Sequence, residues 1–329
     1  MAKPIAALLI VLVTIGWPAP AWAYLKFGIR IGTNLVDVKW TRPVAYFVTE
    51  RGVPGVTATE LRDAIARSFA TWQAVPTARV SSQFLGLTIV PPGLQDGRTT
   101  LGFLDQPDLT QVLGATSFLL DGETGEILES DIFFNTRFDW SVAPRGEAGR
   151  VDLESVALHE IGHLLGLAHS ALGETEMIPA GRRVIGSGSV MFPIAMSPGA
   201  IADRQLQPDD AAGISDLYPA PDFAAATSTI SGRVTKNGSG VFGAHIAAFN
   251  LETGALIGGF ALGAGGEFVI AGLEPGRYLV RAEPLDDAEP ALFFTGPIDL
   301  DFRVGYGPRV ITAPPGAGSD AIDVPVRPK

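Results

Sequence analysis

The chain has 329 residues, a hydrophobic fraction of 47%, a formal net charge of −11, four histidines and no cysteine, a composition typical of a globular protein. The absence of cysteine excludes disulfides, thiolate metal ligands and a cysteine nucleophile. The acidic balance argues against nucleic acid as a partner, because neutralising phosphates requires clustered lysine and arginine.

The first 23 residues have the three parts of a secretory signal peptide. Lys3 supplies a positive charge, an apolar run covers residues 5–15, and Ala21 and Ala23 frame a cleavage site. The run is shorter than the roughly 20 residues that span a bilayer, so we expect a cleaved signal, with an uncleaved anchor as the alternative. We therefore expect a secreted bacterial protein (extracellular, periplasmic or at the cell surface) with no membrane span after signal removal.

The stretch from residue 40 to residue 218 mixes strand and helix patterns. Thr57 and Glu60 form a capping box, and the apolar residues that follow recur at helical spacing, which predicts a helix there. Asp152 is a plausible N-cap for a second helix over residues 151–165. β-Branched and aromatic content predicts strands at residues 43–49, 83–90 and 126–134.

The composition changes after a last helix, which Pro208 opens and Tyr218 closes. Residues 219–228 are rich in proline and alanine, so we expect a linker and a first part that works without the second. Short alternating segments separated by glycine-rich turns then predict an all-β sandwich. The predicted division is a signal peptide at residues 1–23, a first domain at 24–218, a linker at 219–228 and a β-sandwich domain at 229–329.

A cluster of histidines with one glutamate carries the chemistry. On a helix, His159 and His163 lie one turn apart on the same face, so both imidazoles can bind one zinc ion. Gly166 permits the backbone to leave the helix, and the following turn returns His169 as a third ligand. Three protein ligands leave a fourth position for water, as in catalytic zinc sites. Glu160 lies beside this position as a general base rather than a ligand.

This constellation predicts a zinc-dependent metalloendopeptidase with one catalytic zinc ion. Zinc lowers the pKa of its bound water to about 7. Glu160 would take the proton of that water and pass it to the leaving amine, so that peptide bonds of protein or peptide substrates are hydrolysed. A zinc site without activity is the alternative, found in a metal-carrying structural protein or in a cell-surface binding or adhesion protein with a vestigial protease domain.

With Ser170 after the third histidine, the motif resembles that of the matrixins, the matrix-metalloproteinase type of metzincin zinc endopeptidases. Residues 189–193 resemble the Met-turn of that family, which implies that Met191 packs beneath the zinc. Residues 131–140 and 209–218 resemble the approach to the active-site helix and the C-terminal helix. The resemblance implies an α+β fold, in which helices pack on a twisted, mostly parallel sheet, and an enzyme that acts on extracellular matrix or other proteins.

The chain departs from that family at several positions. Phe133 replaces a histidine of the second, structural zinc site, and cysteine-based latency is impossible. The segment between Ser170 and Val190 is longer than usual. Four acids could gather a calcium ion, although a solvated turn is the favoured alternative; they are Asp121, Glu123, Glu126 and Asp131. The segment that would wall the specificity pocket also differs from the family pattern; it consists of Pro193, Ile194 and Ala195.

Residues 229–283 resemble the carboxypeptidase regulatory-like β-sandwich that is appended to secreted bacterial enzymes and surface proteins. The resemblance implies that this domain binds substrate or a cell surface. His245 lies on an alternating strand, which favours a buried histidine over a metal ligand. Asn237 fits a glycosylation acceptor in form, but a hairpin turn is the simpler explanation of its motif.

Overall fold

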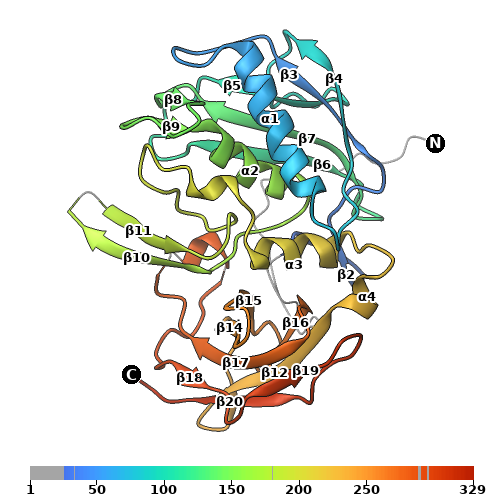
Figure 1. Cartoon of the computed structure of the whole chain (residues 1–329), viewed down its shortest axis with the longest axis vertical. Helices are drawn as coiled ribbons and strands as arrows, with labels where there is room; N and C mark the ends of the chain where they lie inside the picture. Colours follow the sequence, from blue (N-terminus) through green and yellow to red (C-terminus); the bar gives the residue numbers. More distant parts are fainter. Residues whose placement is uncertain (1–25, 33, 180, 288–289, 295) are drawn as a thin grey trace.

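The computed structural model describes residues 26–329 apart from residues 33, 180, 288–289 and 295. Figure 1 shows an upper part (residues 26–218), in which helices pack on a sheet, and a lower part (residues 228–329) built of strands. The predicted signal peptide at residues 1–23 lies outside the described residues. In the described part of the chain, no helix has the length and apolar character that crossing a bilayer requires.

A five-stranded sheet carries the upper part, in the order β4-β3-β5-β7-β6. The first four of these strands run parallel to one another, and β6 pairs antiparallel with β7 at the edge. The mixed sheet and its helices agree with the expected α+β class. The strands are β3 (Val44–Thr49), β4 (Ser82–Thr88), β5 (Thr99–Leu104), β6 (Gly114–Leu120) and β7 (Ile127–Asn135).

Two helices, α1 (Ala58–Gln73) and α2 (Leu153–Leu164), pack against each other beside this sheet. The predicted capping box opens α1, since the Thr57 N–H donates to Glu60 Oε2 (2.8 Å) and the Glu60 N–H donates to Thr57 Oγ1 (3.3 Å). Trp72 is fully buried, and its Nε1–H donates to the Leu158 carbonyl of α2 (2.9 Å). This hydrogen bond fixes the position of α1 along the axis of α2.

Shorter elements surround this core. Hairpin β10–β11 lies within the segment between Ser170 and Val190, and Figure 1 shows it extending sideways between the two parts. The predicted last helix is α3. The shorter elements are β1 (Gly28–Ile31), β2 (Asn34–Asp37), β8 (Trp140–Ser141), β9 (Val151–Asp152), β10 (Gly173–Ile178), β11 (Gly181–Ser187), the 3₁₀ turn η1 (Ala202–Arg204), α3 (Pro208–Leu217) and α4 (Phe223–Ala226).

Two sheets make up the lower part, and apolar side chains of both contribute to one core. The first sheet contains β12 (Ser228–Lys236), β13 (Ser239–Gly240), β16 (Glu267–Leu273) and β20 (Ile322–Val326). The second sheet contains β14 (His245–Asn250), β15 (Leu256–Phe260), β17 (Gly276–Glu283), β18 (Gly305–Tyr306) and β19 (Ile311–Ala313). The 3₁₀ turn η2 (Pro290–Leu292) follows β17.

The segment expected to be a linker is ordered and in part buried. The Ala220 N–H donates to the Thr77 carbonyl (2.9 Å), and α4 follows within the segment. Ala212, which belongs to α3 of the upper part, lies in the apolar core of the lower part. Residues 219–228 therefore connect two parts that also share buried contacts at this junction.

One buried carboxylate, that of Asp131 in β7, organises the loop between β4 and β5. It accepts hydrogen bonds from the N–H groups of Gly93 (2.5 Å) and Thr100 (2.7 Å), and its residue is 4% exposed. Burial raises the pKa of Asp131 to about 7, well above the value near 4 of an unfolded chain. Between these two values the unfolded chain releases a proton that the folded chain keeps.

This difference in pKa predicts a stability that falls as pH rises from about 4 to about 7, because the native state holds more protons in that window. Between pH 5 and pH 6.5, the free energy of unfolding of Asp131→Asn should therefore decline less steeply than that of the wild type. The two slopes should differ by up to about 1.4 kcal/mol per pH unit, the value for one proton. Urea unfolding of wild type and variant across this range measures the slope. Glu50→Gln, at an exposed position, is the control, and a slope of Asp131→Asn equal to that of the control would contradict the assignment.

Candidate metal centre

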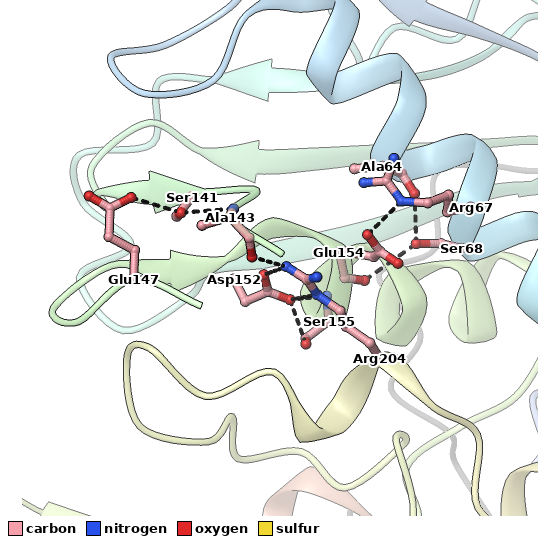
Figure 2. Close-up of polar contacts among 10 residues, drawn as sticks. All are labelled: Ala64, Arg67, Ser68, Ser141, Ala143, Glu147, Asp152, Glu154, Ser155 and Arg204. Carbon is pink, nitrogen blue, oxygen red and sulfur yellow. Dashed lines mark hydrogen bonds and ion pairs between the residues drawn. The ribbon is translucent and has the colours of Figure 1, made fainter. Parts of the chain in front are cut away.

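The helix that carries two of the histidines, α2, is fixed at its N-terminus by Asp152. One oxygen of this carboxylate accepts hydrogen bonds from the N–H (2.9 Å) and the hydroxyl (2.7 Å) of Ser155, as expected of an N-cap. Arg204 forms a two-point ion pair with the same carboxylate, in which Nε lies 2.9 Å from Oδ2 and Nη2 contacts Oδ1 (Figure 2). An exposed pair, Arg67 with Glu154, joins α1 to the same turn (2.7 Å).

Gly166 ends the same helix with backbone geometry that other residues rarely adopt. Its φ is +105°, and an added Cβ would lie 2.2 Å from the Val38 carbonyl oxygen. The N–H of Gly166 donates to the His163 carbonyl (2.7 Å) and that of Leu167 donates to the Gly162 carbonyl (3.0 Å), which is the Schellman pattern of helix termination. The turn predicted at Gly166 is thus present, and it leads the chain back toward the helix.

The structure brings together all three histidines that the sequence singled out. The donor nitrogens of His159, His163 and His169 lie within 4.8 Å of one another. Nε2 of His163 is 3.2 Å from Nε2 of His169. The three rings therefore converge on one point, as the ligands of a single metal ion would.

A backbone carbonyl holds each ring by its other nitrogen. Nδ1 of His159 lies 2.7 Å from the Val190 carbonyl, Nδ1 of His163 lies 2.8 Å from that of Leu167, and Nδ1 of His169 lies 3.1 Å from that of Leu292. A carbonyl only accepts, so each Nδ1 carries the proton. Each Nε2 therefore presents its lone pair toward the other rings, and this arrangement is typical of metal-ligating histidine.

Burial favours the neutral form of the three imidazoles. It lowers the pKa of His159 to about 3, with a further contribution from the charge of His169, and it lowers the pKa of His163 and of His169. Neutral imidazole is the form that binds a metal ion. At neutral pH the site is therefore ready to bind a cation without first releasing protons.

Glu160 lies beside the three rings and is held by the edge strand β6. Thr116 Oγ1 donates to Glu160 Oε2 (2.7 Å). An added Cβ on Gly114 would lie 3.2 Å from Glu160 Oε1, so the glycine leaves room for the carboxylate. Burial raises the pKa of Glu160 to about 7. A carboxyl group with this pKa can both take up and release a proton near neutral pH.

Met191 is buried against α2. An added Cβ on Gly162, which lies between His159 and His163 in the helix, would be 2.3 Å from Met191 Sδ. The buried Asp210 of α3 fixes this turn by accepting from the N–H groups of Val190 (2.9 Å) and Met191 (3.3 Å). The same turn supplies the Val190 carbonyl that orients His159. The structure therefore places Met191 as a packing residue near the ligands.

An open cavity of about 1500 Å³ lies over the three histidines and Glu160. Residues 193–195, expected to form a wall of a specificity pocket, line this cavity. Strand β6 and hairpin β10–β11 also contribute to its surface. The remaining lining residues include Ala291, Leu292, Phe293 and Phe294 from the lower part of the molecule.

Three of the acids considered for calcium, Asp121, Glu126 and Asp131, bind separate partners in the structure. Asp121 Oδ1 accepts from the N–H groups of Glu123 (2.8 Å) and Thr124 (3.1 Å), as in a turn, and Glu126 accepts from the Thr41 hydroxyl (2.5 Å). Within the described ranges, the histidine triad is the one group of three or more His, Cys, Asp or Glu side chains whose donor atoms converge. A calcium ion stays a prediction.

His245 lies apart from the metal centre, in β14 of the lower part. Its Nδ1 is 3.0 Å from Glu283 Oε1, and the residue is 3% exposed. The expected buried histidine is confirmed. Among the four histidines, it is the one that the structure does not bring to the cavity.

Several contributors to the site could not be recognised from the sequence. The carbonyls of Val190, Leu167 and Leu292 leave no signal, because every residue carries a carbonyl group. Asp209 and Asp210 are visible in the sequence only as acids in the first turn of a helix. Thr116 has no motif that would connect it to Glu160.

Comparisons with known proteins agree with this geometry. The family model of the matrixins matches residues 39–219. Metalloendoproteinase 4-MMP of Arabidopsis thaliana is 30% identical over 148 residues, which are 43% of this chain and 41% of the plant protein. Karilysin of Tannerella forsythia is 25% identical over 201 residues, which are 60% of this chain and 37% of karilysin. The chain thus spans less than half the length of either relative.

Three buried or half-buried histidines on a helix and the turn after it, with a glutamate beside them, form a metal-binding centre. The family match covers more than half of the chain, and the chain belongs to the matrixin family. Membership implies zinc, and the residues fit this ion. Tetrahedral zinc with nitrogen ligands at about 2.0–2.1 Å separates two of them by about 3.3 Å, close to the 3.2 Å between His163 and His169.

The two arginines that contact the start of α2, Arg204 and Arg67, should differ sharply in their contribution to stability. The Asp152 and Arg204 side chains are 3% and 16% exposed, so Arg204→Ala leaves a buried carboxylate unpaired and should lower the free energy of unfolding by about 3 kcal/mol. Arg67 is 50% exposed, and Arg67→Ala should cost less than about 1 kcal/mol. Urea unfolding of both variants with zinc at saturation measures the losses. Equal losses would contradict the role given to Asp152.

Proposed function

We propose that this chain is a secreted zinc-dependent metalloendopeptidase that hydrolyses peptide bonds of proteins. The observation that carries the proposal is the convergence of three neutral imidazoles, each held through Nδ1, beside the buried carboxyl group of Glu160. His159, His163 and His169 would hold the ion. Zinc, when bound there, polarises a substrate carbonyl and makes water a stronger acid.

Glu160 performs the proton transfers in this proposal. Its carboxylate accepts a proton as water forms a bond to the carbonyl carbon of the substrate. It then donates that proton to the amine nitrogen as the carbon–nitrogen bond breaks, so the carboxylate is regenerated. The hydrogen bond from Thr116 fixes one carboxyl oxygen and leaves the other for this exchange.

The edge strand β6 supports a peptide as substrate. Within the described part of the chain, β6 pairs with β7 on one side and has no strand on its other side, and residues 114–118 line the cavity. An extended peptide can add to such an edge through main-chain hydrogen bonds, with the adjacent cavity accepting its side chains. Residues 193–195 line the same cavity, and we propose that they contribute to the choice of side chain.

The proposal also covers secretion and the identity of the lower part. Secretion is supported by the sequence pattern of residues 1–23. The lower part, residues 229–329, is proposed to be a carboxypeptidase regulatory-like β-sandwich, which its two sheets with one apolar core support. Its role in binding a substrate or a cell surface follows from the same resemblance.

Replacing Glu160 separates metal binding from catalysis. Glu160→Ala and Glu160→Gln should keep one zinc ion per chain, because the histidines are unchanged, and should lose at least about 100-fold in kcat. Zinc content by mass spectrometry and cleavage of a quenched peptide library measure the two effects. Glu50→Gln, at an exposed position, is the control for removal of an acid elsewhere. Cleavage by Glu160→Ala at the wild-type rate would show that Glu160 is not the base.

A further inference from the structure

The third histidine of the centre depends on a segment far away in the chain. After β17, the chain leaves the sheets of the lower part. It reaches the metal centre at η2 and the two phenylalanines that follow this turn. The Leu292 carbonyl accepts from Nδ1 of His169, a residue 123 positions earlier (3.1 Å). The carbonyls that hold the other two rings lie within residues 39–219, which the family model covers, but Leu292 lies outside them.

Apolar packing fixes the position of this segment. Phe293 and Phe294 are each 6% exposed. The ring of Phe294 packs at 5.3 Å from that of Phe260, and Phe293 lies 6.1 Å from the ring of His169. These side chains belong to an apolar cluster that joins both parts of the molecule and contains Ala171, Val184, Phe192, Phe260, Leu262, Leu285, Phe293 and Phe294.

Polar contacts tie the same two parts together around the site. The buried Asp209 accepts from the hydroxyl of Ser170 (2.6 Å), which follows His169, and from the N–H of Gly258 in β15 (2.8 Å). Thr175 of hairpin β10–β11 donates to the Asp287 carbonyl (2.7 Å). In Figure 1 the orange-red turn η2 lies beside the base of this hairpin. These contacts hold the two parts of the molecule together beside the segment.

The segment also presents an apolar surface to the cavity. Leu292 is 43% exposed and lines the cavity over the histidines. Met177 of β10 is 69% exposed and lines the same cavity. Large apolar side chains that remain exposed within a binding cavity are a common mark of a site for an apolar ligand group.

We propose that residues 290–294 complete the active site across the junction of the two parts. The Leu292 carbonyl is a positioning group, which holds His169 in the tautomer and orientation that bind the metal ion. The Leu292 side chain, together with Met177, forms a subsite for a large apolar side chain of the substrate. The subsite rests on the proposed endopeptidase function, whereas the positioning role concerns metal binding alone.

The positioning role is tested in the full chain with Phe293→Ala/Phe294→Ala, which removes the two anchors, and with the milder Phe294→Leu. Phe249→Ala, an exposed residue of β14 (41%), is the matched control. Loss of a hydrogen bond to a ligating histidine typically weakens metal binding 10- to 100-fold, so the double variant should release zinc to a chelator at least about tenfold faster. Its cobalt-substituted form should show an altered visible absorption spectrum.

Metal release and a cobalt spectrum equal to those of Phe249→Ala would overturn the positioning role. Circular dichroism confirms that the variants are folded. Should the double variant fail to fold, Phe294→Leu decides the question, with an intermediate rate of release expected. These measurements require no cleavage, so they remain decisive if the wild-type protein cleaves no peptide, a result that would count against the proposed function instead.

The subsite is tested with Leu292→Ala, which keeps the carbonyl and removes the side chain. Peptides that differ only in one side chain, leucine or glycine, are compared at each position around the scissile bond. For wild type, leucine should be preferred at one position; Leu292→Ala should reduce that preference about tenfold through KM, with zinc release unchanged. An unchanged preference at every position would overturn the subsite.

Discussion

The centre depends on one kind of interaction, the hydrogen bond from the Nδ1–H of each histidine to a backbone carbonyl. Such a bond selects the tautomer and leaves the Nε2 lone pair free. The three carbonyls come from a turn after the helix, from the turn that contains Met191, and from a segment of the lower part. The rest of the fold serves to bring these three carbonyls to one place.

Different forces fix the three carbonyls. The positive φ of Gly166 sets the direction of the chain that supplies the Leu167 carbonyl. The buried Asp210 holds the backbone N–H groups on either side of the Val190 carbonyl. Apolar packing fixes Leu292, through the phenylalanines that follow it. The centre thus combines a local backbone constraint, a buried polar network and a hydrophobic contact between two parts of the molecule.

Much of this centre follows from local sequence. The spacing of His159 and His163 places them on one helix face, and a glycine such as Gly166 suits the turn at the end of that helix. The grouping of the histidines and the turn could therefore be predicted. The ends of those strands and helices of the upper part that were predicted agree with the structure within a few residues, because hydrophobic periodicity and capping act over short distances. The contribution of Leu292 could not be predicted, since a carbonyl group has no residue identity and its position depends on packing between distant segments.

The close junction at the expected linker could not be predicted for a related physical reason. Proline and alanine indicate a break in secondary structure, but composition does not report whether the flanking parts share a core. Ala212 and Phe192 bury their side chains against residues of the lower part. A small apolar residue on the outer face of a helix is equally compatible with solvent and with a neighbouring sheet, so only the assembled fold reveals the junction.

X-ray absorption at the zinc edge of the full-length, zinc-loaded protein tests this account most directly. Three imidazole nitrogens that point to one ion through Nε2 predict a first shell with three nitrogens at about 2.0–2.1 Å, one further light atom and the outer-shell scattering of three imidazole rings. A shell that contains sulfur from Met191, or the scattering of two imidazoles or fewer, would contradict it.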